Sequence, residues 1–173
     1  MVRTTNMMTF ISTFIIMLMA CSSPNEPLLP TSNSNVNPVD ETQAPMGTSA
    51  RVTDVTVSGD ANNYDFSVTI ASPDTGCDQY ADWWEVFTED GTLIYRRILA
   101  HSHVTEQPFA RSGGRVNIGP EDVVYVRAHM NNLGYGTDVY RGTVANGFMA
   151  DTLAPDHAGH LANEEPLPAG CAF

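Results

Sequence analysis

The sequence contains no lysine: its eight basic residues are all arginines, against 20 aspartates and glutamates, and the formal net charge is −12. Without lysine, the chain cannot form Schiff bases or build a lysine-containing phosphate loop. The acidic balance argues against nucleic acid as a partner, because phosphates require a positively charged surface. A solvated acidic coat that keeps the domain soluble explains this charge without any ligand.

Catalytic motifs are also absent, since the sequence has no GxSxG, HExxH or glycine-rich phosphate loop. Ser102 lies between two histidines. Neighbouring side chains on an extended backbone point to opposite faces, however, which disfavours a catalytic triad built locally. The sequence therefore favours a non-catalytic protein over an enzyme.

Cysteines are few, and none of the three belongs to a CxxC pair. If Cys21 is modified separately near the N-terminus, Cys77 and Cys171 remain as a pair. This predicts a disulfide between them in an oxidising compartment. A bridge over a loop of this length contributes up to ~4–5 kcal/mol in the chain-entropy description. Metal ligation by thiolates is the alternative, and isolated cysteines favour it less.

Residues 1–20 have the pattern of an export signal. Arg3 provides a positive start, Met7 to Met19 is almost wholly apolar, and Ala20 is small. The apolar run is too short to span a bilayer as a helix.

The stretch Leu18-Met19-Ala20-Cys21 resembles the lipobox of bacterial lipoprotein precursors. This resemblance implies that Cys21 becomes the acylated first residue of the mature protein and anchors it in a membrane. Ser22, which is not acidic, implies sorting to the outer membrane of a Gram-negative bacterium. The alternative is an ordinary secretory signal in which Cys21 has no role.

Residues 21–49 are rich in proline, serine, asparagine and threonine and have almost no apolar pattern. Such a segment buries too little apolar surface to offset the entropy of ordering. We therefore predict a disordered tether between the lipid anchor and a folded domain, with an end-to-end distance of roughly 30 Å.

From Arg51 onward apolar residues recur with period two, as in Tyr64, Phe66, Val68 and Ile70. This alternation is typical of antiparallel strands that bury one face. Short turns separate the strands and no amphipathic helix is evident, so the expected fold is a single all-β sandwich of about seven strands over residues 50–146. Residues 147–173 are expected to form an irregular strap over it, pinned by Cys171.

Two of these strands resemble those of fibronectin type III and related immunoglobulin-like domains. The residues that carry the resemblance are Trp84-x-Val86 and Val124-x-Val126-Arg127-Ala128 with the following Gly134-x-Gly136. The resemblance covers roughly residues 51–146 and implies a fold without an activity. The chain is also similar to secreted bacterial proteins for which no activity is implied.

A histidine-rich corner is the first candidate site. His101 and His103 point to the same side of an extended chain, and His129 with Glu106 could complete a copper or zinc shell. The HxH pattern, with Glu106 and Gly113 after it, also comes near the metal-binding motif of the cupins. The alternative is that these histidines only hydrogen-bond the backbone at a loop corner.

A group of arginines is the second candidate site, because guanidinium groups bind carboxylate or phosphate bidentately. The alternative is that they pair with acids such as Glu85, Glu106 and Asp122. The group comprises Arg96, Arg97, Arg111, Arg115 and Arg127.

The leading functional hypothesis is a binding or adhesion module of the cell envelope, with an envelope protein or a glycan as partner. The expected contact surface comprises Trp83, Arg97, Arg111 and Arg127, next to the two histidines of the corner. Aromatic rings outside the core can stack on sugars or anchor a protein. The rings considered are Tyr80, Tyr95, Tyr135 and Tyr140. A metal-binding protein is the second hypothesis.

Overall fold

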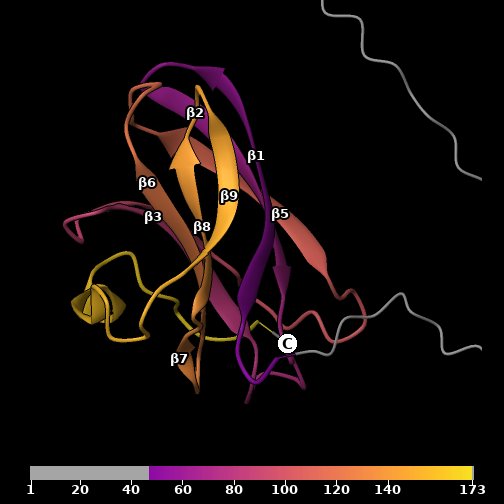
Figure 1. Cartoon of the computed structure of the whole chain (residues 1–173). Coiled ribbons are helices and arrows are strands. Elements are labelled where there is room, and N and C mark those ends of the chain that lie inside the picture. Colours follow the sequence, from indigo (N-terminus) through magenta and orange to yellow (C-terminus); the bar gives the residue numbers. More distant parts are fainter. Residues whose placement is uncertain (1–46, 173) are drawn as a thin grey trace, which may run out of the picture. The chain divides into compact units, whose positions relative to one another are not determined.

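Two antiparallel β-sheets pack face to face and form a β-sandwich, as the alternation predicts (Figure 1). The computed structural model describes residues 47–172, so the expected signal, Cys21 and most of the expected tether lie outside the described residues. One sheet has the strand order β1-β2-β5, and the other β4-β3-β6-β8-β9 with β7 beside β6. The strands are β1 Arg51–Asp60, β2 Asn63–Ala71, β3 Ala81–Thr88, β4 Leu93–Ile98, β5 Phe109–Val116, β6 Val124–Met130, β7 Gly134–Tyr135, β8 Asp138–Thr143 and β9 Gly147–Thr152.

The main core lies between the two sheets. Every second residue of β2 from Tyr64 to Ile70 is buried there, and Trp84 and Val86 of β3 face it from the other sheet. Trp84 and Val86 have no exposed surface. The period-two pattern thus identifies the inner faces correctly.

The outer face of β3 is buried as well, so all residues from Ala81 to Phe87 are buried. Trp83 and Phe87 belong to a second apolar cluster with Tyr135 and Leu161. Leu161 lies in the 3-10 helix η1, Gly159–Asn163, within the C-terminal segment. This segment, residues 153–172, is the predicted strap, and it covers the outer face of the six-stranded sheet.

A disulfide between Cys77 and Cys171 fastens the end of the strap, which confirms the predicted pairing. Near the disulfide, the backbone N–H of Ala172 donates a hydrogen bond to the carbonyl of Ala100 at 2.6 Å. The end of the strap therefore lies beside the chain that follows β4.

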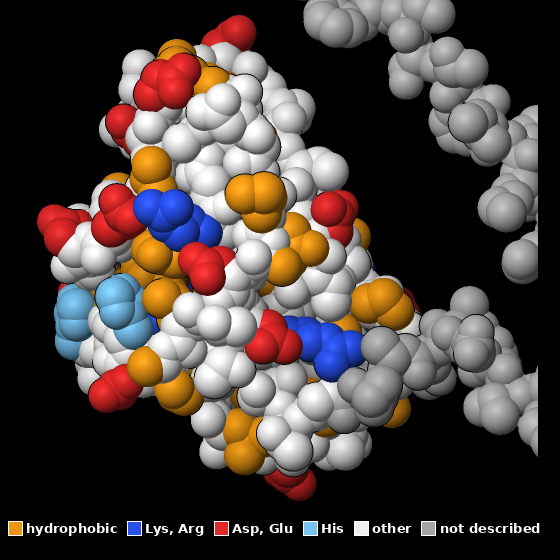
Figure 2. Space-filling model, viewed as in Figure 1, with side chains coloured by type: hydrophobic (Ala, Val, Ile, Leu, Met, Phe, Trp, Pro, Cys, Tyr) orange, Lys and Arg blue, Asp and Glu red, His pale blue; other side chains and the backbone are white. Residues whose placement is uncertain are grey.

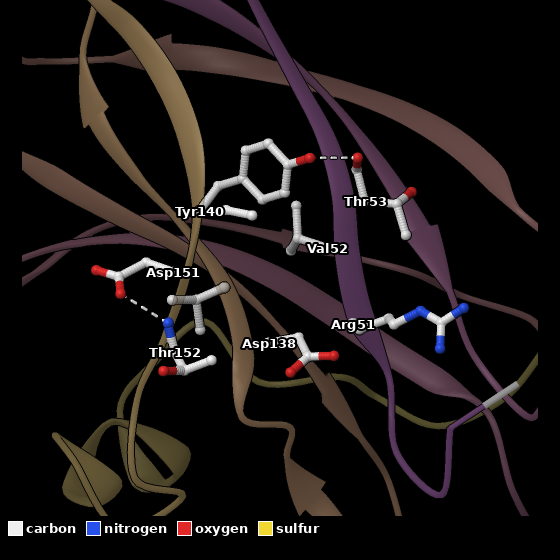
Figure 3. Close-up of a pocket in the computed structure, with 9 residues that line it drawn as sticks. Arg51, Val52, Thr53, Asp138, Tyr140, Asp151 and Thr152 are labelled. Carbon is white, nitrogen blue, oxygen red and sulfur yellow. Dashed lines mark hydrogen bonds between the residues drawn. The ribbon is translucent and has the colours of Figure 1, made fainter. Parts of the chain in front are cut away.

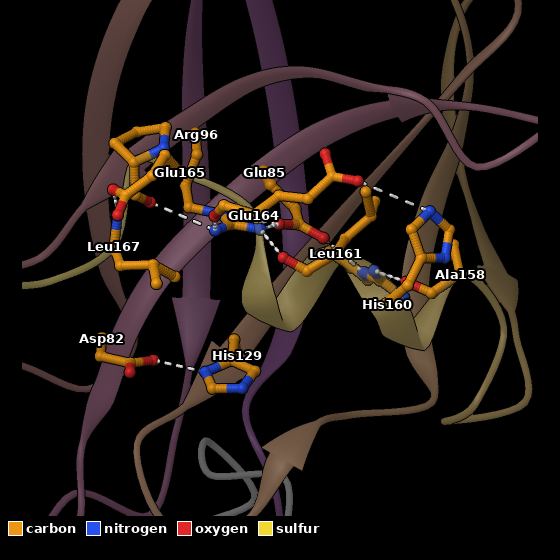
Figure 4. A network of polar contacts seen from close by, with 12 residues as sticks. Asp82, Glu85, Arg96, His129, Ala158, His160, Leu161, Glu164, Glu165 and Leu167 are labelled. Carbon is orange, nitrogen blue, oxygen red and sulfur yellow. Dashed lines mark hydrogen bonds and ion pairs between the residues drawn. The ribbon is translucent and has the colours of Figure 1, made fainter.

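A buried ionic network fastens the middle of the strap (Figure 4). Glu85 of β3 accepts hydrogen bonds from Arg96 of β4 and Arg127 of β6, with the two Nε atoms at 2.9 and 2.8 Å. The remaining guanidinium N–H groups donate to strap carbonyls, Arg96 to Leu161 at 2.6 Å and Arg127 to Ala158 at 3.0 Å. Two arginines of the sheet thus bind the backbone of the strap.

One boundary of the sandwich differs from the sequence prediction. β5 spans Phe109–Val116, although Arg111, Arg115 and three small residues interrupt its apolar pattern. Gly134–Tyr135 pairs with β6 as the short strand β7. β9 pairs with β8 along its length, so the sandwich extends beyond residue 146 to Thr152 and the strap is shorter than expected.

Among residues 47–172, no helix has the length and apolar character that crossing a bilayer requires. Helix makes up only 4% of these residues, against 51% strand. The described part of the chain is therefore all-β, as predicted.

Candidate binding site

Two arginines point inward at one open side of the sandwich. Arg111 of β5 stands opposite Val68 of β2, and Arg97 of β4 stands opposite Trp84 of β3. Directly opposite residues of antiparallel strands share a face, and Val68 and Trp84 lie in the core. Because β4 and β5 are edge strands of different sheets, both side chains start from inward-facing positions at the open edge of the sandwich, where Arg97 is exposed and Arg111 is partly exposed.

A stack of rings lies next to these arginines. The ring of His103 is stacked on Phe109, with the centroids 3.8 Å apart and the planes 11° apart. The ring of His101 lies 4.6 Å from that of His103, and the guanidinium of Arg111 lies 5.3 Å from the Phe109 ring. The two histidines of the corner therefore do come together, as predicted.

Asp74 fixes the loop that carries the histidines. Its buried carboxylate accepts hydrogen bonds from the backbone N–H of His103 at 2.8 Å and of Ala81 at 3.0 Å, and from the Ser72 hydroxyl at 2.7 Å. These bonds tie the loop between β4 and β5 to the loop before β3. The backbone at His103 is thus held in place from outside its own loop.

Gln107 provides a second anchor for the same loop. Its Oε1 accepts from the backbone N–H of Ser72 at 2.8 Å, and its Nε2 donates to the carbonyl of His103 at 3.2 Å. Together with the bond from Ala172 to Ala100, these contacts make the corner a preformed site.

These elements enclose a cavity of about 140 Å³, which we call the seam pocket. Its walls combine two guanidinium groups, two imidazoles and apolar surface. The lining residues are Arg97, Ile98, Leu99, Ala100, His101, His103 and Arg111. The seam pocket thus concentrates positive charge in a protein whose net charge is −12.

His103 is the most unusual member of the seam pocket. Its side chain is 1% exposed, and neither ring nitrogen has a hydrogen-bond partner among residues 47–172. Burial, with the charge of Arg111 and then of His101, lowers the pKa of His103 below its ordinary value, against the opposing effect of Asp74 and Glu106. The ring is therefore neutral at pH 7.

Glu106 pairs with Arg111 outside the pocket lining, at 2.8 Å and with both side chains partly exposed. Its hydrogen bond with Arg111 lowers the pKa of Glu106. This pair and the Glu85 network show that several arginines do pair with acids, as the alternative prediction held. Asp122, the third acid named there, instead accepts a hydrogen bond from the backbone N–H of Gly119.

The predicted four-residue metal site is not assembled. His129 lies on the outer face of the six-stranded sheet, stacked on Trp83 at 3.6 Å and bonded through Nδ1 to Asp82 at 2.7 Å. His103 instead packs on Phe109 of the inner core. Within residues 47–172, no group of three or more histidine, cysteine, aspartate or glutamate side chains is placed to hold a metal ion.

Half of the predicted contact surface is wrong. Trp83 and Arg127 are 3% and 1% exposed, because the strap covers them. Arg97 and Arg111 keep the expected position next to the histidines. Of the other rings, Tyr80 and Tyr135 are buried, while Tyr95 and Tyr140 are partly buried against the core.

A larger groove of about 660 Å³ lies at the other open side, between β1 and β8 with β9 (Figure 3). Tyr140 closes one end by donating a hydrogen bond to the carbonyl of Thr53. The charged lining consists of Arg51, Asp138 and Asp151, so charges of both signs are present. This groove therefore favours no single class of ligand.

On the face drawn in Figure 2, the basic areas are small, and acidic side chains lie next to each of them. Arg141 of β8, for example, pairs with the exposed Glu89. The seam pocket differs in having two arginines and two histidines around one cavity.

Sequence reasoning missed the residues that hold the site. Asp74 is far from the histidines in sequence, and Gln107 and Phe109 belong to no recognisable motif. One signal was available: Asp74 follows a proline in a loop directly after a strand, where a carboxylate often binds backbone N–H groups. Its partner, 29 residues further on, could not be read from the pattern.

Comparison with curated proteins finds a similar protein of Halomicrobium mukohataei, named "Putative lipoprotein". It is 43% identical over 88 residues, which make up 50% of this chain and 43% of that protein. The chain therefore spans less than half of this relative's length. The relative's name is consistent with a lipoprotein.

No protein-family model matches the chain, and no solved structure matches it.

Proposed function

We propose that this chain is an exported lipoprotein, anchored through Cys21, whose β-sandwich is a non-catalytic binding module of the cell envelope. The ligand binds at the seam pocket. The observation that carries the proposal is the inward placement of Arg97 and Arg111 around a buried His103 without hydrogen-bond partners. Binding, rather than catalysis, fits a site with no serine, threonine, cysteine or lysine among its lining residues.

The lipobox and the relative's name support the anchor. We further propose that the domain is of the immunoglobulin or fibronectin type III kind. The two-sheet order, with β1, β2 and β5 in one layer and β4, β3, β6 and β8 in the other, supports this. Loops at the ends of such sandwiches are common binding sites.

The test is photo-crosslinking in cells that export the full chain. A photoreactive amino acid replaces Val104, which is 51% exposed beside the histidines, or Met149, which is 75% exposed on β9. We expect discrete adducts from position 104 that disappear when Arg97 and Arg111 are both changed to glutamine. Adducts from position 149 should not respond to these changes.

A Cys21→Ala variant separates the anchor from the pocket. This variant should leave the membrane fraction, whereas the arginine variant should remain in it. Fractionation of the same cells tests the outer membrane as the location that Ser22 predicts. Identical adducts from both crosslinking positions, insensitive to the arginines, would contradict the binding module.

A further inference from the structure

We propose that the chemical group bound in the seam pocket is an oxyanion, either a phosphate, a sulfate or a carboxylate. This inference rests on the proposed binding role of the same pocket and adds the class of its ligand. It follows from the charge of the lining, the unpartnered ring nitrogens of His103, the size of the cavity and the fixation of the loop between β4 and β5.

Charge is the first argument. Arg96 and Arg127, the other arginine pair of the sheet, share the buried carboxylate of Glu85 between them. Arg97 and Arg111 line one cavity with no acid in its lining, while Glu106 binds Arg111 from outside and Asp74 binds the backbone of His103. Two like charges beside one cavity repel each other, so an anion between them lowers the free energy.

His103 is the second argument. A buried ring nitrogen without a partner costs free energy unless a ligand completes its hydrogen bond. Nδ1 faces Asp74 at 4.0 Å, beyond hydrogen-bond distance. The ring lines the seam pocket, and an oxyanion there provides an acceptor for an imidazole N–H.

Size is the third argument. A water molecule takes about 30 Å³ in the liquid, so the 140 Å³ of the seam pocket hold on the order of five heavy atoms. A tetrahedral oxyanion, or a carboxylate with its attached carbon, has this size. A sugar ring or an amino-acid side chain fits only if the remainder of the ligand lies outside.

Fixation of the loop is the fourth argument. The backbone of His103 is bound by Asp74 at 2.8 Å and by Gln107 at 3.2 Å. Arg97 lies on β4, which is hydrogen-bonded to β3, and Arg111 lies on β5, which is hydrogen-bonded to β2. Donors held in place before binding lose little entropy when the ligand arrives, and a forked guanidinium binds two oxygens of an oxyanion at once.

The test is isothermal titration calorimetry on the full chain in detergent at pH 7, with inorganic phosphate, sulfate or acetate as titrant and chloride as the reference anion. We expect saturable binding of at least one oxyanion and none of chloride. Arg97→Gln and Arg111→Gln should each raise its Kd by at least about tenfold, because each removes charge-assisted hydrogen bonds. The strongest of the three titrants identifies the oxyanion.

Arg141→Gln is the matched control, because Arg141 pairs with an exposed glutamate as Arg111 does but lies on β8. This variant should bind like the wild type. The inference is overturned if none of the three anions binds at millimolar concentration, or if Arg141→Gln weakens binding as much as the two pocket variants do.

These results are separable from those on the proposed function. Crosslinks that depend on Arg97 and Arg111 without any oxyanion binding would retain the binding module and reject the ligand class. Oxyanion binding without such crosslinks would retain the ligand class and reject an envelope partner at this site.

Discussion

Replacing Glu85 by alanine should lower the free energy of unfolding by roughly 3–5 kcal/mol, since it leaves two buried guanidinium groups without their carboxylate. The side chains of Arg96 and Arg127 are 0% and 2% exposed. Both also bind strap carbonyls, so the strap should detach in the variant and admit water to the arginines. Urea unfolding measures the loss, and hydrogen exchange over residues 153–172 detects the release.

Two further variants show whether the buried charges cause the effect. Glu85→Gln keeps the volume and an oxygen acceptor but removes the charge, so it should destabilise nearly as much as alanine. Glu89→Ala removes an exposed partner of Arg141 and should leave the unfolding free energy unchanged within error. A Glu85→Ala variant as stable as Glu89→Ala would show that the network does not hold the strap.

The second large effect is expected from the disulfide. Cys77 and Cys171 are 94 residues apart in sequence, and a loop of about this length contributes ~4–5 kcal/mol by restricting the unfolded chain. Changing both cysteines to serine should therefore lower the free energy of unfolding by about 4 kcal/mol. The variant should still fold, because Glu85 and its two arginines hold the middle of the strap independently.

Reduction of the wild-type protein should reproduce this loss in urea unfolding, and the same reductant should not affect the double serine variant. A loss below about 1 kcal/mol would mean that the unfolded chain gains little freedom when the bridge opens. In that case the ionic network, rather than the disulfide, would be the main fastening of the strap.

The inner faces of the strands were predictable because one face of each strand is apolar, as Tyr64 to Ile70 show. The outer face of β3 was not. Trp83, Glu85 and Phe87 alternate with core residues, so the sequence pattern predicts that they face solvent. In the structure the C-terminal strap covers them. Sequence periodicity gives the face of a side chain but not what later packs on that face.

The candidate site was half predictable for the same reason. The proximity of His101 and His103 follows from their spacing on an extended chain, and Arg97 and Arg111 were expected next to them. His129 was grouped with them because nothing in the sequence places its strand position on the opposite side of the sheet from His103. The pairing register, which decides this, depends on contacts between distant strands.

The most direct test of the central claim, that the seam pocket binds an oxyanion, is an NMR pH titration of the His103 ring with and without phosphate. Burial and the charge of Arg111 lower the pKa of His103 in the free protein, and a bound anion favours the charged ring. We predict that phosphate raises the pKa of His103 in the wild-type protein. Equal pKa values of His103 with and without phosphate would contradict the claim.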